Sequence, residues 1–234
     1  MHARRELEWL ENRLPTTEAR FAIPFIFRGR GRFRSIRARQ TVAELQELYR
    51  RVVEAKPCRV VEIGTARGGT LYLWAQAAAD NATIVSVDLP GGPFGGGYEP
   101  CRKQLYMDFK KSDAQQMHLI RDDSHLHETF ERVRKTLDGQ QADLLFIDAD
   151  HTYEGVKTDF IQYAPLVRPG GMIAMHDIKP SSDPDTQVER LWVQLKERID
   201  VDEIVFPDVA NKNRELGIGV ITVPAGGIVD QQFD

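Results

Sequence analysis

The hydrophobic residues of this chain follow two alternating patterns. Short, almost continuous apolar runs predict buried strands, and the segments between them carry apolar residues at the spacing of amphipathic helices. The predicted strands are residues 59–63, 83–88, 117–121, 143–148, 172–177, 203–206 and 216–222. The predicted helices are residues 1–14, 41–55, 70–79, 99–113, 126–137, 153–163 and 188–199. This alternation predicts an α/β protein with a Rossmann-like, mostly parallel sheet and helices on both faces.

One region departs from this alternation. Residues 20–40 begin with an apolar stretch, and six arginines then follow closely: Arg28, Arg30, Arg32, Arg34, Arg37 and Arg39. We interpret residues 1–40 as an N-terminal extension and residues 41–234 as the main domain. The extension either folds over the active site or a neighbouring subunit, where its arginines would meet an acidic substrate group, or is a solvated basic segment. In the next helix, Thr41 and Glu44 have the spacing of a capping box.

The turn after the first predicted strand has the glycines of a nucleotide-binding site. Gly64 interrupts the apolar strand that contains Glu62, and Gly68 precedes the next helix. A dinucleotide fingerprint requires a glycine where this chain has Ala66, so the turn does not match a pyrophosphate site. The glycines still let the backbone approach a ligand at the carboxyl edge of the sheet. The alternative is a tight turn that binds nothing.

Further candidate ligand residues follow the second and third strands. Asp88 ends a strand where this fold places a carboxylate that holds the ribose hydroxyls of a nucleoside. The alternative is that Asp88 only forms a turn. Residues 89–98 contain five glycines, so we expect either a mobile lid beside the ligand or an ordinary crossover loop. Asp122, Asp123 and Ser124 form the loop after the third strand, where either aspartate contacts the ligand or the segment caps the following helix.

The fourth and fifth predicted strands end in acidic and imidazole side chains. Asp148 ends the fourth strand, and His176 and Asp177 end the fifth. Neighbouring strands lie about 4.8 Å apart, so these side chains can reach one ion, and their donor atoms suit Mg²⁺ or Mn²⁺. His151, shortly after Asp148, is our candidate general base. The alternative is two unrelated clusters of turn-forming acids, a buried histidine and a histidine that caps a helix.

The composition argues against several other classes of protein. With 234 residues, 41% hydrophobic and 28% charged, the chain suits one soluble domain. A net charge of -4 argues against nucleic acid as a partner, and no apolar run is long enough to cross a membrane. Cys58 and Cys101 form neither a disulfide framework nor a C-x-x-C metal pair. We therefore expect a cytoplasmic protein.

Together, the motifs resemble a known family. EIGTARGGT, DLPGGPFGGGY, DLLFIDADHTYEGV and RPGGMIAMHD are similar to class I S-adenosylmethionine-dependent methyltransferases, in the subgroup of the cephalosporin-biosynthesis protein CmcI and macrolide sugar O-methyltransferases. The resemblance covers residues 41–223 and implies a seven-stranded sheet whose last strand is antiparallel. It implies S-adenosylmethionine (SAM) at Glu62, Gly64, Gly68, Asp88 and Asp123, and the adjoining Thr65, Leu89 and Ser124 complete the predicted cofactor site. It also implies a metal at Asp148, His176 and Asp177, with His151 as base.

Two residues depart from the family pattern: His176, where relatives commonly have a carboxylate, and Asp122, where they usually have glycine. We predict a SAM- and metal-dependent O-methyltransferase that acts on a hydroxyl of a small molecule, such as a sugar or natural-product intermediate. Asp148 and His151 are the predicted catalytic residues, Mg²⁺ is the expected ion, with Mn²⁺ or Fe²⁺ as alternatives, and we expect a homo-oligomer. The alternatives are a non-haem iron oxygenase, with Asp148, His151 and His176 as its ligand triad, and a non-catalytic partner subunit.

Overall fold

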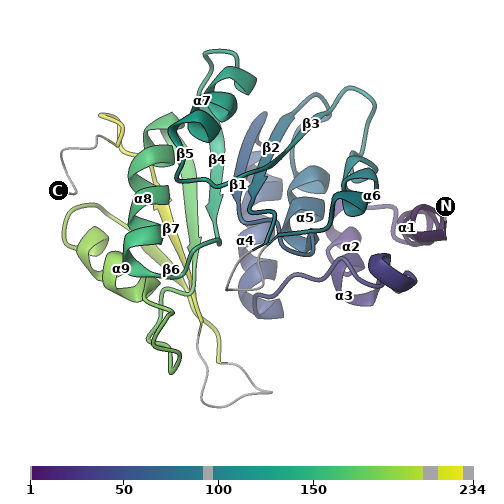
Figure 1. Cartoon of the computed structure of the whole chain (residues 1–234), viewed down its shortest axis with the longest axis horizontal. Coiled ribbons are helices and arrows are strands. Elements are labelled where there is room, and N and C mark those ends of the chain that lie inside the picture. Colours follow the sequence, from purple (N-terminus) through teal and green to yellow (C-terminus); the bar gives the residue numbers. More distant parts are fainter. Residues whose placement is uncertain (1, 92–96, 208–215, 229–234) are drawn as a thin grey trace.

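A seven-stranded sheet forms the centre of the protein, whose computed structural model describes residues 2–91, 97–207 and 216–228. The strand order is β3-β2-β1-β4-β5-β7-β6 (Figure 1). The strands are β1 (Arg59–Ile63), β2 (Thr83–Asp88), β3 (Gln116–Arg121), β4 (Ala142–Ile147), β5 (Val167–His176), β6 (Asp202–Ile204) and β7 (Ile218–Thr222). β1 to β5 are parallel, and the last strand, β7, is antiparallel as predicted and lies between β5 and β6. The order reverses between β1 and β4, which is where such sheets bind ligands.

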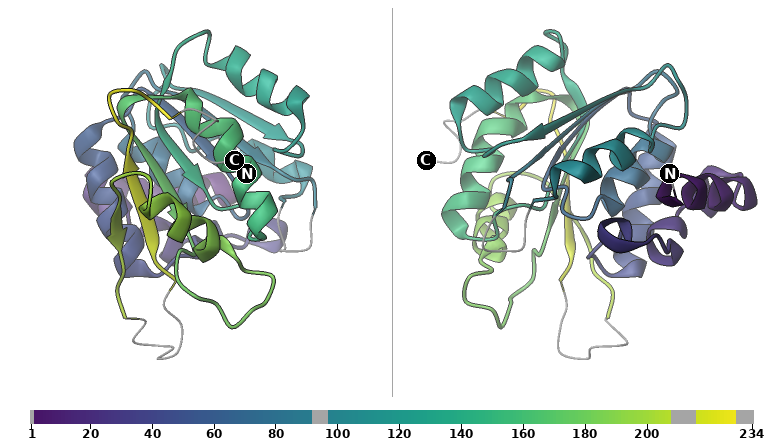
Figure 2. Two further views of the ribbon diagram at one scale, coloured as in Figure 1. Left: turned by 90° about the vertical axis from the view of Figure 1, so that its left-hand side faces the viewer. Right: turned by 45° about the vertical axis from the view of Figure 1, so that its right-hand side comes forward.

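Helices cover both faces of the sheet. They are α1 (His2–Arg13), α2 (Thr17–Arg20), α3 (Ile23–Ile26), α4 (Val42–Ala55), α5 (Gly69–Ala77), α6 (Lys103–Met107), α7 (His127–Thr136), α8 (Tyr153–Tyr163) and α9 (Val188–Lys196), with 3₁₀ turns η1 (Gly31–Phe33), η2 (Pro100–Arg102) and η3 (Ala164–Leu166). α1 to α6 lie on one face, and α7 to α9 cover the other (Figure 1, Figure 2). Successive strand residues point to opposite faces, so Val60 joins the first core and Val61 the second.

The N-terminal extension packs against the rest of its own chain. Its buried residues include Phe21, Ile23, Phe27, Ile36 and Ala38. A Cβ on Gly69, at the start of α5, would lie 2.1 Å from Ala38 N, so the extension passes directly over this helix end. The buried Arg102 guanidinium donates hydrogen bonds to the carbonyl oxygens of Arg32 and Ser35. These contacts fix the extension beside the glycine turn.

Residues 99–113 do not form the single helix that the sequence predicted. η2 and α6 end at Met107, and the chain then turns. Leu105, Tyr106 and Phe109 are buried, with Tyr106 and Phe109 in aromatic contact. The short helix and the turn after it bury these three side chains, so the helical pattern in the sequence extends further than the helix.

The predicted capping box at α4 is also wrong. Thr41 is the N-cap residue but makes no side-chain capping hydrogen bond. Glu44 is buried and accepts hydrogen bonds from the backbone N–H groups of Phe206 and Gly217, at 3.3 and 3.1 Å. The glutamate therefore connects α4 to the β6 and β7 region instead of capping its own helix.

β5 begins earlier than predicted, because the Arg-Pro-Gly-Gly stretch belongs to the strand. Gly170 has a φ of +72°, and the β4–β5 register shifts between Ala142 and Leu144.

None of the described helices is long and apolar enough to span a membrane. Cys58 and Cys101 are exposed free thiols. The predicted lid, residues 89–98, lies partly outside the described residues, and its role stays a prediction.

Candidate active site

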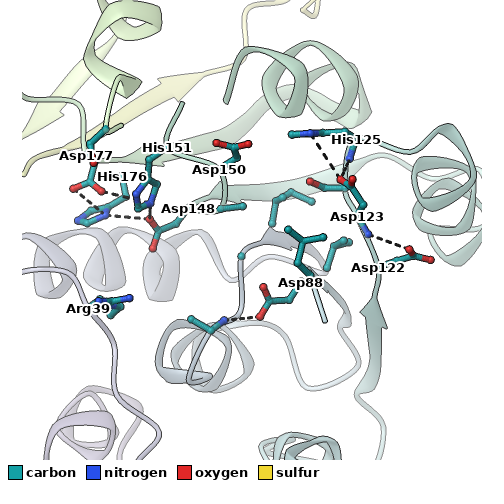
Figure 3. A pocket seen from close by; sticks show the side chains of 18 of the residues that line it. Arg39, Asp88, Asp122, Asp123, His125, Asp148, Asp150, His151, His176 and Asp177 are labelled. Atoms are coloured by element: carbon teal, nitrogen blue, oxygen red, sulfur yellow. Dashed lines mark hydrogen bonds and ion pairs between the residues drawn. The ribbon is translucent and has the colours of Figure 1, made fainter. Parts of the chain in front are cut away.

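A cavity of about 440 Å³ opens at the carboxyl ends of the parallel strands (Figure 3). Backbone hydrogen bonds extend the sheet to its rim: Asp148 N donates to Ile63 O, and Asp122 N donates to Asp88 O, both at 2.9 Å. The cavity brings together these predicted site residues: Gly64, Asp88, Leu89, Asp123, Ser124, Asp148, His151, His176 and Asp177. Residues implied in cofactor binding and residues implied in metal binding therefore face one space.

The glycine turn forms one wall of this cavity. Gly64 has a φ of +96°, and a Cβ there would lie 2.0 Å from Asp148 O, so only glycine allows β1 to turn this close to β4. Ala66 N donates to Asp88 Oδ2 at 2.8 Å, and Gly97 N donates to Asp88 Oδ1 at 3.1 Å. Burial raises the pKa of Asp88 to about 6. Asp88 thus connects the glycine turn to the loop after β2.

Three predicted cofactor residues, at the end of β1 and in the glycine turn, do not line the cavity: Glu62, Thr65 and Gly68. Ser86 Oγ donates a hydrogen bond to Glu62 Oε2 at 2.8 Å, and Ser86 Oγ is also hydrogen-bonded to Thr65 Oγ1. Burial raises the pKa of Glu62 to about 8. A Cβ on Gly68 would lie 2.7 Å from the Tyr106 ring. These residues support the turn from inside the protein, and direct contact with a cofactor stays a prediction.

Carboxylates and imidazoles gather at the opposite wall (Figure 3). One ligand atom from each of Asp148, His151 and Asp177 lies within 4.8 Å of the other two. His151 Nε2 is 3.4 Å from Asp148 Oδ1 and 3.6 Å from Asp177 Oδ2. His176 Nδ1 is 3.2 Å from Asp148 Oδ1 and 3.4 Å from Asp177 Oδ1. Among the described residues, the group that can meet at one ion is therefore Asp148, Asp177 and His151, the predicted base. The predicted ligand His176 contacts both carboxylates but does not belong to this group.

These side chains shift one another's pKa values. Burial alone would raise the pKa of Asp148, but the His176 and His151 imidazoles outweigh it and hold this pKa below its ordinary value. Burial would lower the pKa of His176, but the carboxylates of Asp148 and Asp177 raise it to about 10. Burial would also lower the pKa of His151, but the Asp148 carboxylate outweighs burial and raises this pKa. The carboxylates therefore favour a positive charge beside them, either a proton on an imidazole or a cation.

The donor atoms of this cluster fit a divalent cation. Asp177 Oδ1 is buried and has no hydrogen bond of good geometry within the part of the chain that the structure describes. Asp177 also has a φ of +60°, which is uncommon outside glycine. A buried carboxylate oxygen of this kind calls for a partner, and carboxylate oxygens with imidazole nitrogens are suitable ligands for Mg²⁺ or Mn²⁺.

The N-terminal extension completes the site. Gln40 is buried, and its Nε2 donates a hydrogen bond to Asp148 Oδ2 at 2.5 Å. Gln40 Oε1 accepts a hydrogen bond from Arg39 N at 3.1 Å. Arg39 itself lines the cavity. The sequence pattern left an active-site role for the extension open, beside contact with a neighbouring subunit and a solvated basic segment, and it did not identify Gln40.

His125 is a second site residue that the sequence pattern did not identify. It lines the cavity after β3, with Nε2 3.5 Å from Asp159 Oδ1 and Nδ1 3.8 Å from Asp123 Oδ1. Asp159, on α8, is fully buried, and its interaction raises the pKa of His125 to about 9. No local pattern in the sequence relates His125 to a residue on α8, so only the folded structure reveals this pair.

The strand order, the antiparallel β7 and a cavity where the order reverses define a Rossmann-like, ligand-binding α/β protein. A family profile described as a methyltransferase domain matches residues 61–178, about half of the chain. The chain therefore belongs to this methyltransferase family, as the motifs predicted. The finer assignment to the CmcI and macrolide sugar subgroup stays a prediction.

Solved structures share the fold at low sequence identity. TomG, an O-methyltransferase of tomaymycin synthesis from Streptomyces achromogenes in complex with SAM, has a TM-score of 0.55 and 17% identity, over 96% of this chain and 99% of TomG. An O-methyltransferase from Bacillus cereus in complex with SAH has a TM-score of 0.55 and 14% identity, over 92% and 96% of the two chains. Cofactor-bound Rv0187 from MTB has a TM-score of 0.55 and 19% identity, over 88% and 86%. These similarities confirm the class I methyltransferase fold.

The uncharacterized protein y4gI of Sinorhizobium fredii is similar over part of its length. It is 30% identical over 125 residues, which are 52% of this chain and 13% of y4gI. This chain therefore spans only a small part of the length of that relative.

Proposed function

We propose that this chain is a SAM-dependent, divalent-metal-dependent O-methyltransferase that acts on a hydroxyl of a small molecule. The observation that carries the proposal is one cavity, lined both by Gly64 and Asp88 and by the carboxylates and imidazoles near Asp148. Methyl transfer requires the donor and the acceptor oxygen to be held together and aligned. The family assignment favours methyl transfer over the iron oxygenase alternative, and the O-methyltransferases solved with SAM or SAH support the donor.

The glycine-turn wall would hold the donor. Asp88 would accept hydrogen bonds from the ribose hydroxyls, and Asp123 and Ser124 would contact the adenine. SAM supplies the methyl group: the C–S bond breaks with its electron pair left on sulfur while the C–O bond forms, which gives SAH and a methyl ether. Gly64, which lets β1 turn close to Asp148, lines the cavity at this wall.

The opposite wall would prepare the acceptor. Asp148, Asp177 and His176 would hold the cation, which when bound lowers the pKa of an acceptor hydroxyl. The His151 side chain is 23% exposed and that of His176 only 4%, so His151 is the imidazole that an acceptor can reach. We assign His151 as the base that takes the hydroxyl proton at a ring nitrogen.

Calorimetric titration with SAM tests the donor site. Wild type should bind SAM, and Asp88→Ala should lose most of this affinity because no carboxylate remains for the ribose. Asp113→Ala, an exposed aspartate that does not line the cavity, is the matched control and should bind SAM like wild type. Equal SAM affinity in Asp88→Ala would contradict the assignment.

Titration with Mn²⁺ separates the two roles open to His151. Asp148→Asn should lose Mn²⁺ binding. His151→Ala should keep the Mn²⁺ affinity but lose turnover by about 10²–10⁴-fold, as for the removal of a general base. Loss of Mn²⁺ affinity in His151→Ala would instead make this residue a ligand.

Two results would favour the other functions. Oxygen uptake with Fe²⁺ that does not require SAM would support the oxygenase. SAM binding without turnover on any hydroxylated compound would indicate a non-catalytic subunit.

A further inference from the structure

The end of the N-terminal extension alternates between the core and the exposed side. Ile36, Ala38 and Gln40 are buried, whereas Arg37 and Arg39 between them are exposed. Side chains in an extended segment point to opposite sides in turn, so the three buried residues fix the direction of both arginines. Of the two, only Arg39 lines the cavity.

The residues before and after Arg39 in the sequence fix its position. Before it, Ala38 lies against Gly69, where an added Cβ would come within 2.1 Å of Ala38 N. After it, Gln40 accepts the Arg39 N–H and donates to Asp148 Oδ2 at 2.5 Å. In Figure 3, Arg39 lies on the Asp148 side of the cavity. Its position is therefore coupled to that of a predicted metal ligand.

The guanidinium of Arg39 has no hydrogen bond or ion pair with any side chain or carbonyl of the described residues. It is also the one arginine or lysine among the described residues that line the cavity. Seven aspartates line it as well: Asp88, Asp122, Asp123, Asp148, Asp150, Asp177 and Asp183. These acids suit the positive sulfonium and amino groups of SAM and a metal cation. An anionic group of a ligand has one permanently charged partner here, Arg39.

We propose that Arg39 forms an anion-binding subsite and that the methyl acceptor carries a carboxylate or phosphate close to the hydroxyl that is methylated. The planar guanidinium matches the two oxygens of such a group through paired hydrogen bonds. The inference rests on the proposed function, because that function puts the reacting hydroxyl beside Asp148. Gln40, the residue after Arg39, is hydrogen-bonded to Asp148. The acceptor class is then a hydroxylated acid, such as a sugar acid, a sugar phosphate or a hydroxybenzoate.

Matched pairs of ligands test this subsite. Protein saturated with SAH and Mn²⁺ is titrated with sugar acids, sugar phosphates and hydroxybenzoates, and with the corresponding neutral sugars and methyl esters, by thermal shift and calorimetry. Wild type should bind at least one acid about tenfold or more tightly than its neutral counterpart, as expected for a charge-assisted hydrogen-bonded pair. Arg39→Gln should lose this preference, and Arg39→Lys should keep part of it. Arg37→Gln removes a neighbouring exposed charge that does not line the cavity and should behave like wild type.

Three results overturn the subsite: no acid binds, neutral counterparts bind equally well, or Arg39→Gln keeps the preference for acids. A separate titration compares SAM with methylthioadenosine, which lacks the methionine carboxylate. If Arg39→Gln weakens SAM binding but leaves methylthioadenosine binding unchanged, the anion is the carboxylate of the donor and the acceptor proposal is wrong. Failure of wild type to bind SAM at all would overturn the proposed function instead.

Discussion

Replacing Glu62 with glutamine should remove a large part of the pH dependence of folding stability. Glu62 is fully buried under the glycine turn, and burial raises its pKa from an ordinary value of 4.5 to about 8. Between these pH values the folded protein keeps a proton that the unfolded chain has released. The free energy of unfolding therefore falls as the pH rises through this range.

The size of the effect follows from the two pKa values. A difference of one unit between the folded and unfolded pKa values corresponds to about 1.4 kcal/mol. The pKa shift of Glu62 therefore lowers the free energy of unfolding by roughly 5 kcal/mol, and this full loss is reached only above about pH 8. Glutamine is uncharged at every pH and can still accept the hydrogen bond from Ser86. The raised pKa of Asp88 acts in the same direction, but it does so in both proteins and cancels when they are compared.

Urea unfolding at a series of pH values between about 5 and 8 measures this difference. Wild type should lose stability across the series more steeply than Glu62→Gln. Glu154→Gln, on the exposed side of α8, is the matched control and should follow wild type, because its side chain stays in water when the chain folds. Parallel stability curves for wild type and Glu62→Gln would refute the reasoning and show that the folded protein accommodates the charged carboxylate.

Three further substitutions test how the site is built. Gly64→Ala should lower the free energy of unfolding by about 2 kcal/mol or more, because a Cβ would collide with Asp148 O; Gly91→Ala, where the Cβ meets nothing, is the control, and similar urea midpoints for both variants would contradict this. Arg102→Met should cost about 2–4 kcal/mol by the same assay, since the part-buried carbonyl oxygens of Arg32 and Ser35 lose a charged donor; a loss below about 1 kcal/mol would contradict this. Gln40→Leu should weaken Mn²⁺ binding about 10–100-fold by calorimetry, as for the loss of a ligand-orienting contact, with SAM affinity unchanged; unaltered Mn²⁺ affinity would rule out this role.

The sheet and its ligand-binding edge could be predicted because they depend on local patterns. An apolar run such as residues 143–148 can be stable only as a buried strand or helix, and its short length favours a strand. Once parallel strands are assigned, their carboxyl ends must lie along one edge, so the sequence alone predicts that Asp88, Asp148 and Asp177 lie near one another. The structure confirms this placement.

The contacts that join distant segments could not be predicted. Glu44 has the spacing of a helix cap, yet it binds backbone N–H groups near β6 and β7. Gln40 meets Asp148, and His125 meets Asp159, across separations that no periodicity in the sequence encodes. The alternation of apolar and polar residues before Gln40 was a usable signal for an extended segment with one buried side, but the arginine content of the segment obscured it.

A crystal of the protein soaked with SAH and Mn²⁺ tests most directly whether one cavity holds both the donor and the cation. Anomalous scattering locates the manganese independently of the protein coordinates. We expect manganese bound by Asp148, Asp177 and His176, with the SAH ribose on Asp88 and its sulfur facing the metal. Manganese at another place, or SAH bound outside this cavity, would contradict it.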